Sequence, residues 1–373
     1  MSQVCRVITA PGLKGLAGAI FRAMGSSAAE SARVAENLVL ANLSGHDSHG
    51  VGMIPRYVQS WQQGGLVLDA RLRVCHDGGA VLTLDGQRGF GQSIGEQAIE
   101  LGVARAREHG VCVLALHNSH HLGRIGHWAE LAASRGMVSM HFVNVAGHTQ
   151  VAPWGGVDGR FGTNPFCAGI PRPGAEPFIL DFATSAVAIG KTRVAFNKGE
   201  PLPEGSAIDH EGRPTTDAAA LNRPPLGALL PFGAHKGFGM AVLCELLGGA
   251  FSGGYTTHQE TRQTTRAIIN GMLSVLINPD ALAAPDAARQ VDAFMAWVQA
   301  SRHEGGEGVL EPGEPERQCR TRRLENGIPV DGASWQQLLD AAGTVGARLE
   351  GLDLGRDYPA SALFTVARKL SSS

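Results

Sequence analysis

The chain has 373 residues, of which 43% are hydrophobic and 18% charged, and its formal net charge is −2. These values are ordinary for a globular protein, and the charge gives no support for nucleic-acid binding. No apolar run approaches the roughly 20 residues that span a bilayer, and the N-terminus lacks a secretion signal, so no membrane partner is expected. The six cysteines are scattered without a CxxC pair, which is typical of reduced thiols and favours a cytoplasmic location.

The N-terminal part of the chain has the spacing of helices. Apolar residues recur at helical intervals between residues 11 and 24, and Ser27 with Glu30 forms a capping box before a second helix. That helix ends near the segment SGHDSHG, and a third helical stretch covers residues 54–62. We therefore predict that residues 1–75 form part of a mainly helical domain.

From about residue 80 onward the pattern alternates between strands and helices, which predicts an α/β core. The predicted elements are strands over 80–84, 111–116 and 137–143 and helices over 92–109 and 123–134. A loop-rich stretch, 144–235, follows. Later predictions are a helix over 237–251 that packs closely on another backbone, a strand over 268–277, a helix over 286–301, a loop over 303–320, and a last helix capped by Ser334 and Gln337.

The most informative segment is HNSHHLGRIGH, residues 117–127, which directly follows the apolar run 111–116. Such a run is typical of a buried strand, and open α/β sheets bind ligands where their strands end. Histidine titrates near neutral pH, so His121, which precedes Leu-Gly-Arg, is a candidate for proton transfer. A second histidine segment, SGHDSHGVGMIPRY, carries His49 and Arg56.

Histidine clusters also bind metals, so a zinc site is the alternative interpretation. Carboxylate and cysteine partners do not occur at ligand spacing, and we therefore predict no metal. For His46, His117 and His127 the sequence favours structural, hydrogen-bonded roles.

The glycine-rich stretch 89–95 is the nearest match to a dinucleotide-binding fingerprint. Its spacing is one residue too long, and no acidic residue follows at the expected place. We therefore interpret it as a strand-to-helix turn, and any nucleotide must be held in another way.

Two other segments have chemistry that suits a nucleotide. Lys236 stands at the start of a predicted helix beside Gly237, where free N–H groups and the helix dipole attract phosphate. A solvated lysine beside a packed helix is the alternative. Asp181 ends an apolar strand and could accept hydrogen bonds from ribose hydroxyls, or could cap a helix.

Taken in order, these segments resemble the malate/L-lactate/ureidoglycolate dehydrogenase family, which has a non-Rossmann nicotinamide-binding fold. The matching segments are DSHGVGMIPRY, NSHHLGRIG, VAPWGG, FGTNPF, DFATS, NKGEPLPEG, GAHKGFG and PGEPER. The forms HDSHGVGM and FVNVAGH are most similar to the hydroxycarboxylate dehydrogenase B branch.

The resemblance implies an α/β fold in which a nicotinamide-binding domain of mixed sheet and helices spans residues 76–317. A mainly helical domain would comprise residues 1–75 and the C-terminal segment 318–373. It implies an NAD(P)-dependent oxidoreductase that interconverts 2-hydroxy acids and 2-oxo acids. NAD is the expected cofactor, with NADP as the alternative, and a homodimer is expected.

The resemblance also implies roles for individual residues. His121 falls on the general acid/base histidine, His49 belongs to the same catalytic set, and Arg56 would bind the substrate carboxylate, with Arg124 as its competitor. The residues implied to line the cofactor are His49, His121, Leu122, Gly123, Asp181, Phe182, Ala183, Thr184, Ser185, Lys236, Asn270, Gly313, Glu314, Pro315 and Glu316.

Other functions stay open at this point. A cyclic imino acid reductase of the same family is one, and a metal-dependent hydrolase or lyase built on the histidines is another. A binding protein that retains a nucleotide without turnover is the third. The sequence also does not distinguish aliphatic, aromatic and dicarboxylic acids as substrates.

Overall fold

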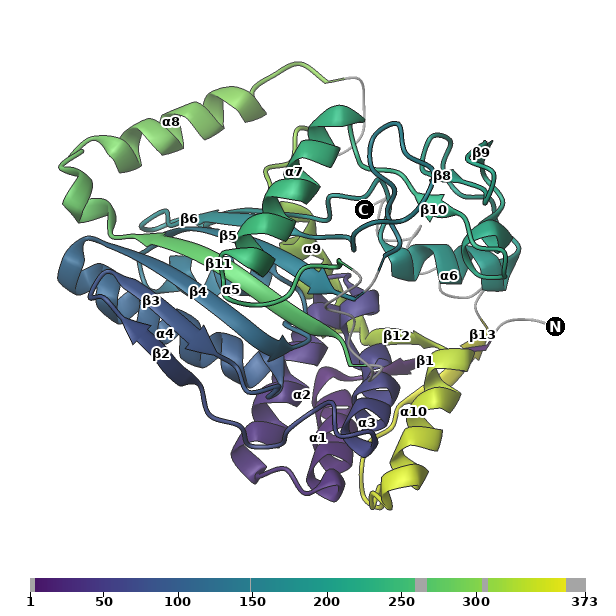
Figure 1. Ribbon diagram of the computed structural model, residues 1–373. Coiled ribbons are helices and arrows are strands. Elements are labelled where there is room, and N and C mark those ends of the chain that lie inside the picture. The colour runs from purple at the N-terminus through teal and green to yellow at the C-terminus, as the bar shows by residue number, and fades with distance from the viewer. Residues whose placement is uncertain (1–3, 148, 259–266, 304–307, 360–373) are drawn as a thin grey trace. The chain divides into compact units, whose positions relative to one another are not determined.

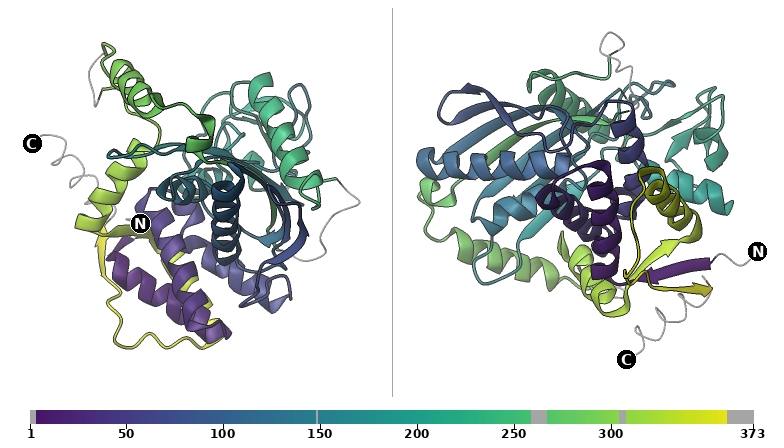
Figure 2. Two further views of the ribbon diagram at one scale, coloured as in Figure 1. Left: turned by 90° about the vertical axis from the view of Figure 1, so that its left-hand side faces the viewer. Right: turned by 90° about the horizontal axis from the view of Figure 1, so that it is seen from below.

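The computed structural model describes residues 4–147, 149–258, 267–303 and 308–359 (Figure 1, Figure 2). The chain divides into two compact units. Unit 1 comprises Met1–Asp69 and Glu314–Ser373, and unit 2 comprises Ala70–Gly313. The sequence predicts domain boundaries after residues 75 and 317, which are a few residues later than the observed boundaries after Asp69 and Gly313.

Unit 1 is mainly helical. Its elements are β1 (Val4–Ile8), α1 (Ala10–Met24), α2 (Ala28–Leu43), the 3-10 turns η1 (Asp47–His49) and η2 (Val51–Met53), α3 (Ile54–Gln62), α9 (Glu314–Asn326), β12 (Ile328–Asp331), α10 (Gly332–Val345) and β13 (Arg356–Pro359). Ser27 caps α2 as predicted, because its Oγ accepts the N–H of Glu30 at 3.3 Å. A small antiparallel sheet, β12-β1-β13, joins the beginning of the chain to its C-terminal part and was not predicted.

Two sequence predictions for the C-terminal segment are wrong. A loop is predicted over 303–320, but α9 begins at Glu314, and the acidic side chains of Glu314 and Glu316 favour its first turn through the helix dipole. The last helix is capped by Asp331 rather than by Ser334. The Oδ1 atom of Asp331 accepts the N–H of Ser334 at 2.9 Å.

Unit 2 is built around a seven-stranded mixed sheet in the order β2-β3-β4-β11-β5-β6-β7. Its strands are β2 (Arg73–Asp77), β3 (Val81–Asp85), β4 (Val111–His120), β5 (Val138–Ala146), β6 (Phe166–Ile170), β7 (Phe178–Phe182) and β11 (Ile269–Ile277). Only β3 and β4 pair in parallel, and the other neighbours in this sheet are antiparallel. This pairing differs from the parallel, doubly wound Rossmann sheet, so the expected non-Rossmann α/β fold is confirmed.

Helices cover both faces of this sheet (Figure 2). One face carries α4 (Gly91–His109) and α5 (Gly126–Ser134), which pack on β4, β5 and β6 around the buried side chains of Leu84, Leu114 and Trp128. The other face carries α7 (His235–Glu245) and the π-helical turn η4 (Leu246–Ala250). No helix among the described residues is long and apolar enough to cross a membrane.

Small residues let η4 lie directly on the sheet, as the sequence predicts for this segment. A Cβ atom on Gly271 of β11 would lie 1.9 Å from the carbonyl oxygen of Gly248. A Cβ on Gly248 would lie 2.7 Å from the backbone nitrogen of Asn144. Neither position therefore accepts a side chain.

The loop-rich stretch 144–235 contains more regular structure than the sequence predicts. Besides β6 and β7 it includes α6 (Ile189–Lys198), β8 (Ala207–Ile208), β9 (Pro214–Thr215), η3 (Ala218–Leu221) and β10 (Ala228–Leu229). The last three strands form a separate small sheet in the order β10-β8-β9. Beyond β11 the chain forms η6 (Pro279–Leu282) and α8 (Ala287–Gln299).

His141 of β5 is buried inside this sheet and is satisfied by two hydroxyl groups. Its Nδ1 lies 2.7 Å from Oγ of Ser274, and its Nε2 lies 3.0 Å from Oγ of Ser139. Burial lowers the pKa of His141 to about 3. In the unfolded chain His141 binds a proton as the pH falls through the usual histidine pKa of about 6.5. In the folded protein the same side chain stays neutral until the pH nears 3.

The free energy of unfolding should fall as the pH drops below about 6.5, with His141 contributing about 1.4 kcal/mol per pH unit until the pH nears 3. Denaturant titrations of wild type and His141→Gln between about pH 6 and pH 4 measure this slope. The variant should have a slope smaller by about that amount, whereas His210→Gln, at an exposed histidine, should keep the wild-type slope. An unchanged slope in His141→Gln would contradict the assignment.

Candidate active site

The exit of β4 is the first part of the candidate site. The apolar run predicts that this strand ends at residue 116, but antiparallel pairing with β11 continues as far as His120, opposite Ile269. The prediction is wrong by four residues because the partner strand extends the pairing into polar residues. His121 is consequently the first residue beyond the strand, and it is partly exposed.

Asn270 fixes the backbone next to His121. Its Oδ1 accepts the N–H of Leu122 at 2.9 Å, and its Nδ2 donates to the carbonyl of Asn144 at 2.8 Å. The pairing of β4 with β11 shifts register just after Asn270, between that residue and Met272. In unit 2 the side chain of Asn270 thus positions the His121 segment.

The first turn of α4 packs on the same exit. A Cβ atom on Gly91 would lie 2.2 Å from the carbonyl oxygen of His121 and 2.6 Å from that of His120. A residue other than glycine would therefore displace the His121 backbone. This close approach explains Gly91 in the glycine-rich stretch, which forms the strand-to-helix turn that the sequence predicts.

The two adjacent histidines differ in their environment. His120 is buried, and burial lowers its pKa to about 3, so its imidazole is neutral near pH 7. Because the His120 ring is enclosed, it does not face a ligand that binds from solvent. His121 is the partly exposed member of the pair and is therefore the better candidate for exchanging protons with a ligand.

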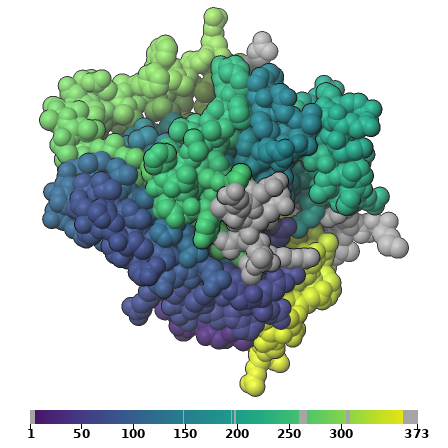
Figure 3. Space-filling model, viewed as in Figure 1, coloured from purple at the N-terminus to yellow at the C-terminus, as the bar shows by residue number. Residues whose placement is uncertain are grey.

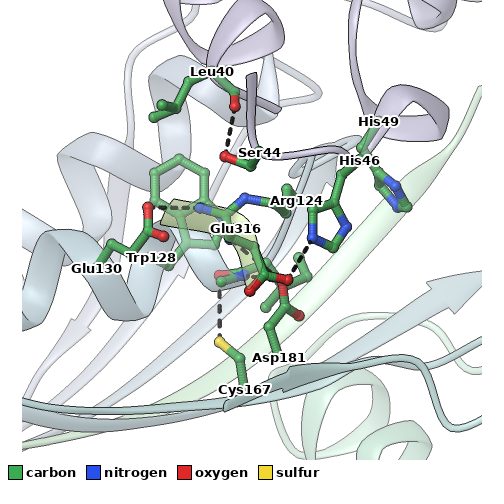
Figure 4. A network of polar contacts seen from close by, with 12 residues as sticks. Leu40, Ser44, His46, His49, Arg124, Trp128, Glu130, Cys167, Asp181 and Glu316 are labelled. Carbon is green, nitrogen blue, oxygen red and sulfur yellow. Dashed lines mark hydrogen bonds and ion pairs between the residues drawn. The ribbon is translucent and has the colours of Figure 1, made fainter. Parts of the chain in front are cut away.

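Arg124 is engaged by two carboxylates of unit 2. Its Nη2 lies 2.6 Å from Oε2 of Glu130, and its Nη1 lies 3.8 Å from Oδ2 of Asp181 (Figure 4). The side chain of Arg124 is only 3% exposed. Because its charge is already balanced by these partners, Arg124 is a weak candidate for binding a substrate carboxylate.

Asp181 has a second structural partner. Its Oδ2 accepts the N–H of Gly126 at 2.9 Å, at the start of α5, where a negative charge is favourable. Asp181 is one of the residues that the resemblance implies to line the cofactor. Its contacts with Gly126 and Arg124 connect the end of β7 to the segment that follows His121.

The chain beyond β7 meets the entrance of α7. The N–H of Phe232 donates to the carbonyl of Thr184 at 3.0 Å, and Ser185 forms a β-bridge with Pro231. Thr184 is itself held by hydrogen bonds from its Oγ1 to the carbonyls of Thr163 and Asn164, at 2.9 Å and 3.0 Å. The predicted residues 184–185 thereby lie next to residues 231–232, which precede Lys236 by a few positions.

A pocket of about 340 Å³ opens at this junction. Its lining consists of Trp154, Ala186, Gly205, Leu230, Pro231, Phe232, Gly233 and Ala234. The exposed side chain of Lys236 follows two residues later, in the first turn of α7. Apolar surface for a flat ring and a cation at a helix N-terminus for a phosphate are features that nucleotides use, so these residues could hold part of a nicotinamide dinucleotide.

Two buried residues that sequence analysis did not single out support the same part of unit 2. Asn144 accepts the N–H of Gly271 at 3.0 Å and donates to the carbonyl of Tyr255 at 2.7 Å. Glu245, at the end of α7, accepts a hydrogen bond of 2.7 Å from Nδ2 of Asn164. Neither residue lies in a spacing pattern that would have indicated a role.

Unit 1 holds the other predicted residues. His49 ends η1, and its Nδ1 lies 2.9 Å from Oγ of Ser48. The adjacent Asp47 forms a two-pronged ion pair with Arg323 of α9, at 2.6 Å and 3.0 Å. This ion pair holds the turn η1, which contains His49, against α9. Arg56, the other predicted residue in this part of the chain, lies in α3 and is exposed.

Glu316 of α9 is anchored in the same way. Its Oε1 lies 3.1 Å from Nε2 of His46 (Figure 4). His46 therefore makes the structural contact that the sequence predicts for it. His49, Arg56 and residues 314–316 belong to unit 1, and residues 121–123, 181–185, Lys236, Asn270 and Gly313 belong to unit 2.

Comparison with known proteins decides the family. Residues 8–339 match the protein family described as malate/L-lactate dehydrogenase. The chain belongs to the malate/L-lactate dehydrogenase family. It is therefore an oxidoreductase of the dehydrogenase class, and the family depends on pyridine nucleotides, as the resemblance implied.

Individual relatives extend this result over nearly the whole chain. Hydroxycarboxylate dehydrogenase B of Escherichia coli (strain K12) is 52% identical over 335 residues, which is 90% of this chain and 93% of the relative. L-lactate dehydrogenase of Cupriavidus necator is 39% identical over 309 residues, which is 82% of this chain and 88% of the relative. A solved structure from Escherichia coli has a TM-score of 0.89 and 48% identity over 98% of this chain and 99% of that chain.

Proposed function

We propose that this dehydrogenase interconverts 2-hydroxy acids and 2-oxo acids with NAD(H). The observation that carries the proposal is the 52% identity, over 90% of the chain, to a hydroxycarboxylate dehydrogenase. The lactate dehydrogenase relative supports the same substrate class. The expected partner is a small-molecule acid, and we expect a cytoplasmic homodimer, whose subunit number gel filtration would test.

His121 is the proposed general acid/base. In the oxidative direction its neutral imidazole takes the proton of the substrate hydroxyl, and in the reductive direction its protonated form returns a proton to the carbonyl oxygen. The support is its position beyond β4, on a backbone held by Asn270 and packed against Gly91. Its neighbour His120 is 1% exposed and is therefore enclosed, away from a ligand that binds from solvent.

Arg56 is the proposed anchor for the substrate carboxylate, with His49 in the same catalytic set. A guanidinium binds a carboxylate through two parallel hydrogen bonds, which fixes the orientation of the acid. Arg124, the competing candidate, is already engaged by Glu130 and Asp181. Arg56 lies at the surface, where a substrate can reach it, whereas the Arg124 side chain is only 3% exposed.

The residues of unit 2 that we propose to bind the nicotinamide cofactor lie around the pocket beside α7. Residues 184–185, the pocket beside them and Lys236 would hold the cofactor, with Lys236 binding a phosphate. Asp181 and Asn270 would act mainly through the backbone segments that they position. When bound, the nicotinamide supplies the hydride acceptor or donor. We propose NAD over NADP on the likeness to the hydroxycarboxylate dehydrogenase branch.

The test is a panel of aliphatic, aromatic and dicarboxylic 2-oxo acids together with cyclic imines, each assayed with NADH and NADPH by the absorbance of the reduced nicotinamide. The proposal expects turnover of at least one 2-oxo acid, with NADH preferred. Turnover of cyclic imines alone would instead identify a cyclic imino acid reductase. Tight NADH binding without turnover of any compound would indicate a binding protein, and activity that a chelator abolishes and zinc restores would indicate a metal-dependent enzyme.

A further inference from the structure

Three side chains with metal-binding chemistry meet at one edge of the sheet in unit 2. They are Cys75 of β2, Asp85 at the end of β3 and His117 of β4, and one ligand atom of each lies within 4.8 Å of the others. Strand β2 forms the edge of this sheet (Figure 1) and is exposed along its length at the molecular surface (Figure 3), whereas β3 beside it is mostly buried. This cluster is separate from the pocket beside Lys236.

Strand pairing explains why the sequence shows no ligand spacing here. Asp85 lies opposite His117 in the parallel pair of β3 with β4, and opposite Arg73 in the antiparallel pair of β2 with β3. The register of the second pair shifts between Val74 and His76, so the intervening Cys75 sits at a β-bulge. Bulges at sheet edges redirect side chains, which accounts for the meeting of Cys75 with Asp85 and His117.

His117 is oriented as metal-binding histidines are. Its Nδ1 lies 3.0 Å from the carbonyl oxygen of Ser252, which can only accept a hydrogen bond, so Nδ1 carries the proton. The other ring nitrogen, Nε2, then has a lone pair for a ligand. A histidine that donates one ring N–H to a carbonyl while the other nitrogen binds the ion is the usual arrangement at metal sites.

Asp85 is equally well prepared. Its Oδ1 accepts the N–H of Gln87 at 2.8 Å and Nδ2 of Asn118 at 2.9 Å. Burial alone would raise the pKa of Asp85, but these hydrogen bonds and the one from Arg73 outweigh burial and lower the pKa. The carboxylate is therefore ionised at neutral pH, as a ligand must be.

The fourth neighbour of the cluster is a cation. Nη2 of Arg73 lies 2.7 Å from Oδ2 of Asp85, and the Arg73 side chain is 64% exposed. An exposed arginine can move into solvent when another cation takes its place. Arg73 therefore competes with a metal ion for the carboxylate of Asp85, and substitution of Arg73 should increase the affinity of the cluster for the ion.

We propose that Cys75, Asp85 and His117 form a binding site for a first-row transition metal ion, with Zn²⁺ as the natural occupant. Sulfur, imidazole nitrogen and carboxylate oxygen are all zinc ligands, and a water would complete four-coordination. A thiolate with an imidazole disfavours Ca²⁺ and Mg²⁺, which prefer oxygen. On binding, the Cys75 thiol releases its proton to solvent, and the ion ties the edge strand β2 to β3 and β4, so it stabilises unit 2 without taking part in turnover.

Titration of chelator-treated, full-length protein with Co²⁺ tests the proposal, because cobalt bound to a thiolate has a charge-transfer absorption band and Zn²⁺ should displace it. Wild type should show this band, and Cys75→Ser should lose it and bind at least about 100-fold more weakly, since even changes outside the ligand set cost about 10–100-fold. Cys319→Ser, at another partly exposed thiol, and His76→Gln, next to the bulge, are the controls and should bind as wild type does.

Arg73→Gln provides a test in the opposite direction. Removal of the competing positive charge should tighten Co²⁺ and Zn²⁺ binding by roughly fivefold, and Zn²⁺ should raise the melting temperature of this variant and of wild type but not of Cys75→Ser. Indistinguishable Co²⁺ spectra and affinities for wild type and Cys75→Ser would overturn the proposal. So would weaker metal binding by Arg73→Gln, since this variant keeps all three ligands.

Discussion

Arg56→Ala is expected to raise the KM for the 2-oxo acid by at least about 30-fold, with NADH affinity unchanged. Truncating one partner of a hydrogen-bonded charge pair that the bound substrate buries costs about 2–5 kcal/mol, and each 1.4 kcal/mol is about tenfold in affinity. Steady-state kinetics with saturating NADH, together with a fluorescence titration of NADH, measure both quantities. Arg56→Lys should recover only part of the loss, because an ammonium keeps the charge and loses the two-pronged geometry.

The matched comparison is Arg124. Its removal leaves the carboxylates of Glu130 and Asp181 without their shared cation, so Arg124→Ala should mainly lower the free energy of unfolding. A stable, folded Arg124→Ala protein with a greatly raised KM, beside an Arg56→Ala protein with a normal KM, would transfer the carboxylate-binding role to Arg124.

His121→Gln is expected to lower kcat by about 10²–10⁴-fold, which is the range that a positioned acid/base group contributes. The affinity for NADH should stay within a few fold of wild type, because the change removes a proton-transfer group and leaves the pocket beside Lys236 intact. Steady-state rates in both reaction directions measure the effect. The loss should appear in both, since the same imidazole takes and returns the proton.

His127→Gln is the matched control for this prediction. His127 belongs to the same histidine-rich segment but lies in α5, with its ring 4.8 Å from that of Trp128. Its substitution should leave kcat near the wild-type value. A loss confined to His49→Gln, with His121→Gln fully active, would instead assign the proton transfer to His49.

Local patterns were sufficient to predict much of the fold. The capping residue Ser27, the apolar runs of β3 and β4, and the small residues of η4 each depend on neighbours close in sequence, and the structure agrees with all three. The errors arise where distant segments decide the outcome. The extension of β4 to His120 depends on pairing with β11, which lies far along the chain.

The candidate site shows the same division. The histidine and glycine motifs were visible as residue types, and the family resemblance assigned their roles. The actions of individual side chains depend on nonlocal contacts that no spacing reveals. Asn270 reaches Leu122, and Arg124 is engaged by Glu130 and Asp181. The meeting of Cys75 with Asp85 and His117 likewise requires the pairing of three strands.

A single-turnover experiment tests the central role of His121 most directly, because it separates the chemical step from product release. The preformed NADH complexes of wild type and His121→Gln are mixed rapidly with a 2-oxo acid that the wild type reduces, and the loss of NADH absorbance is followed. We expect equal NADH binding by the two proteins and a rate constant about 10²–10⁴-fold smaller for the variant. Equal rate constants for the two proteins would contradict this role of His121.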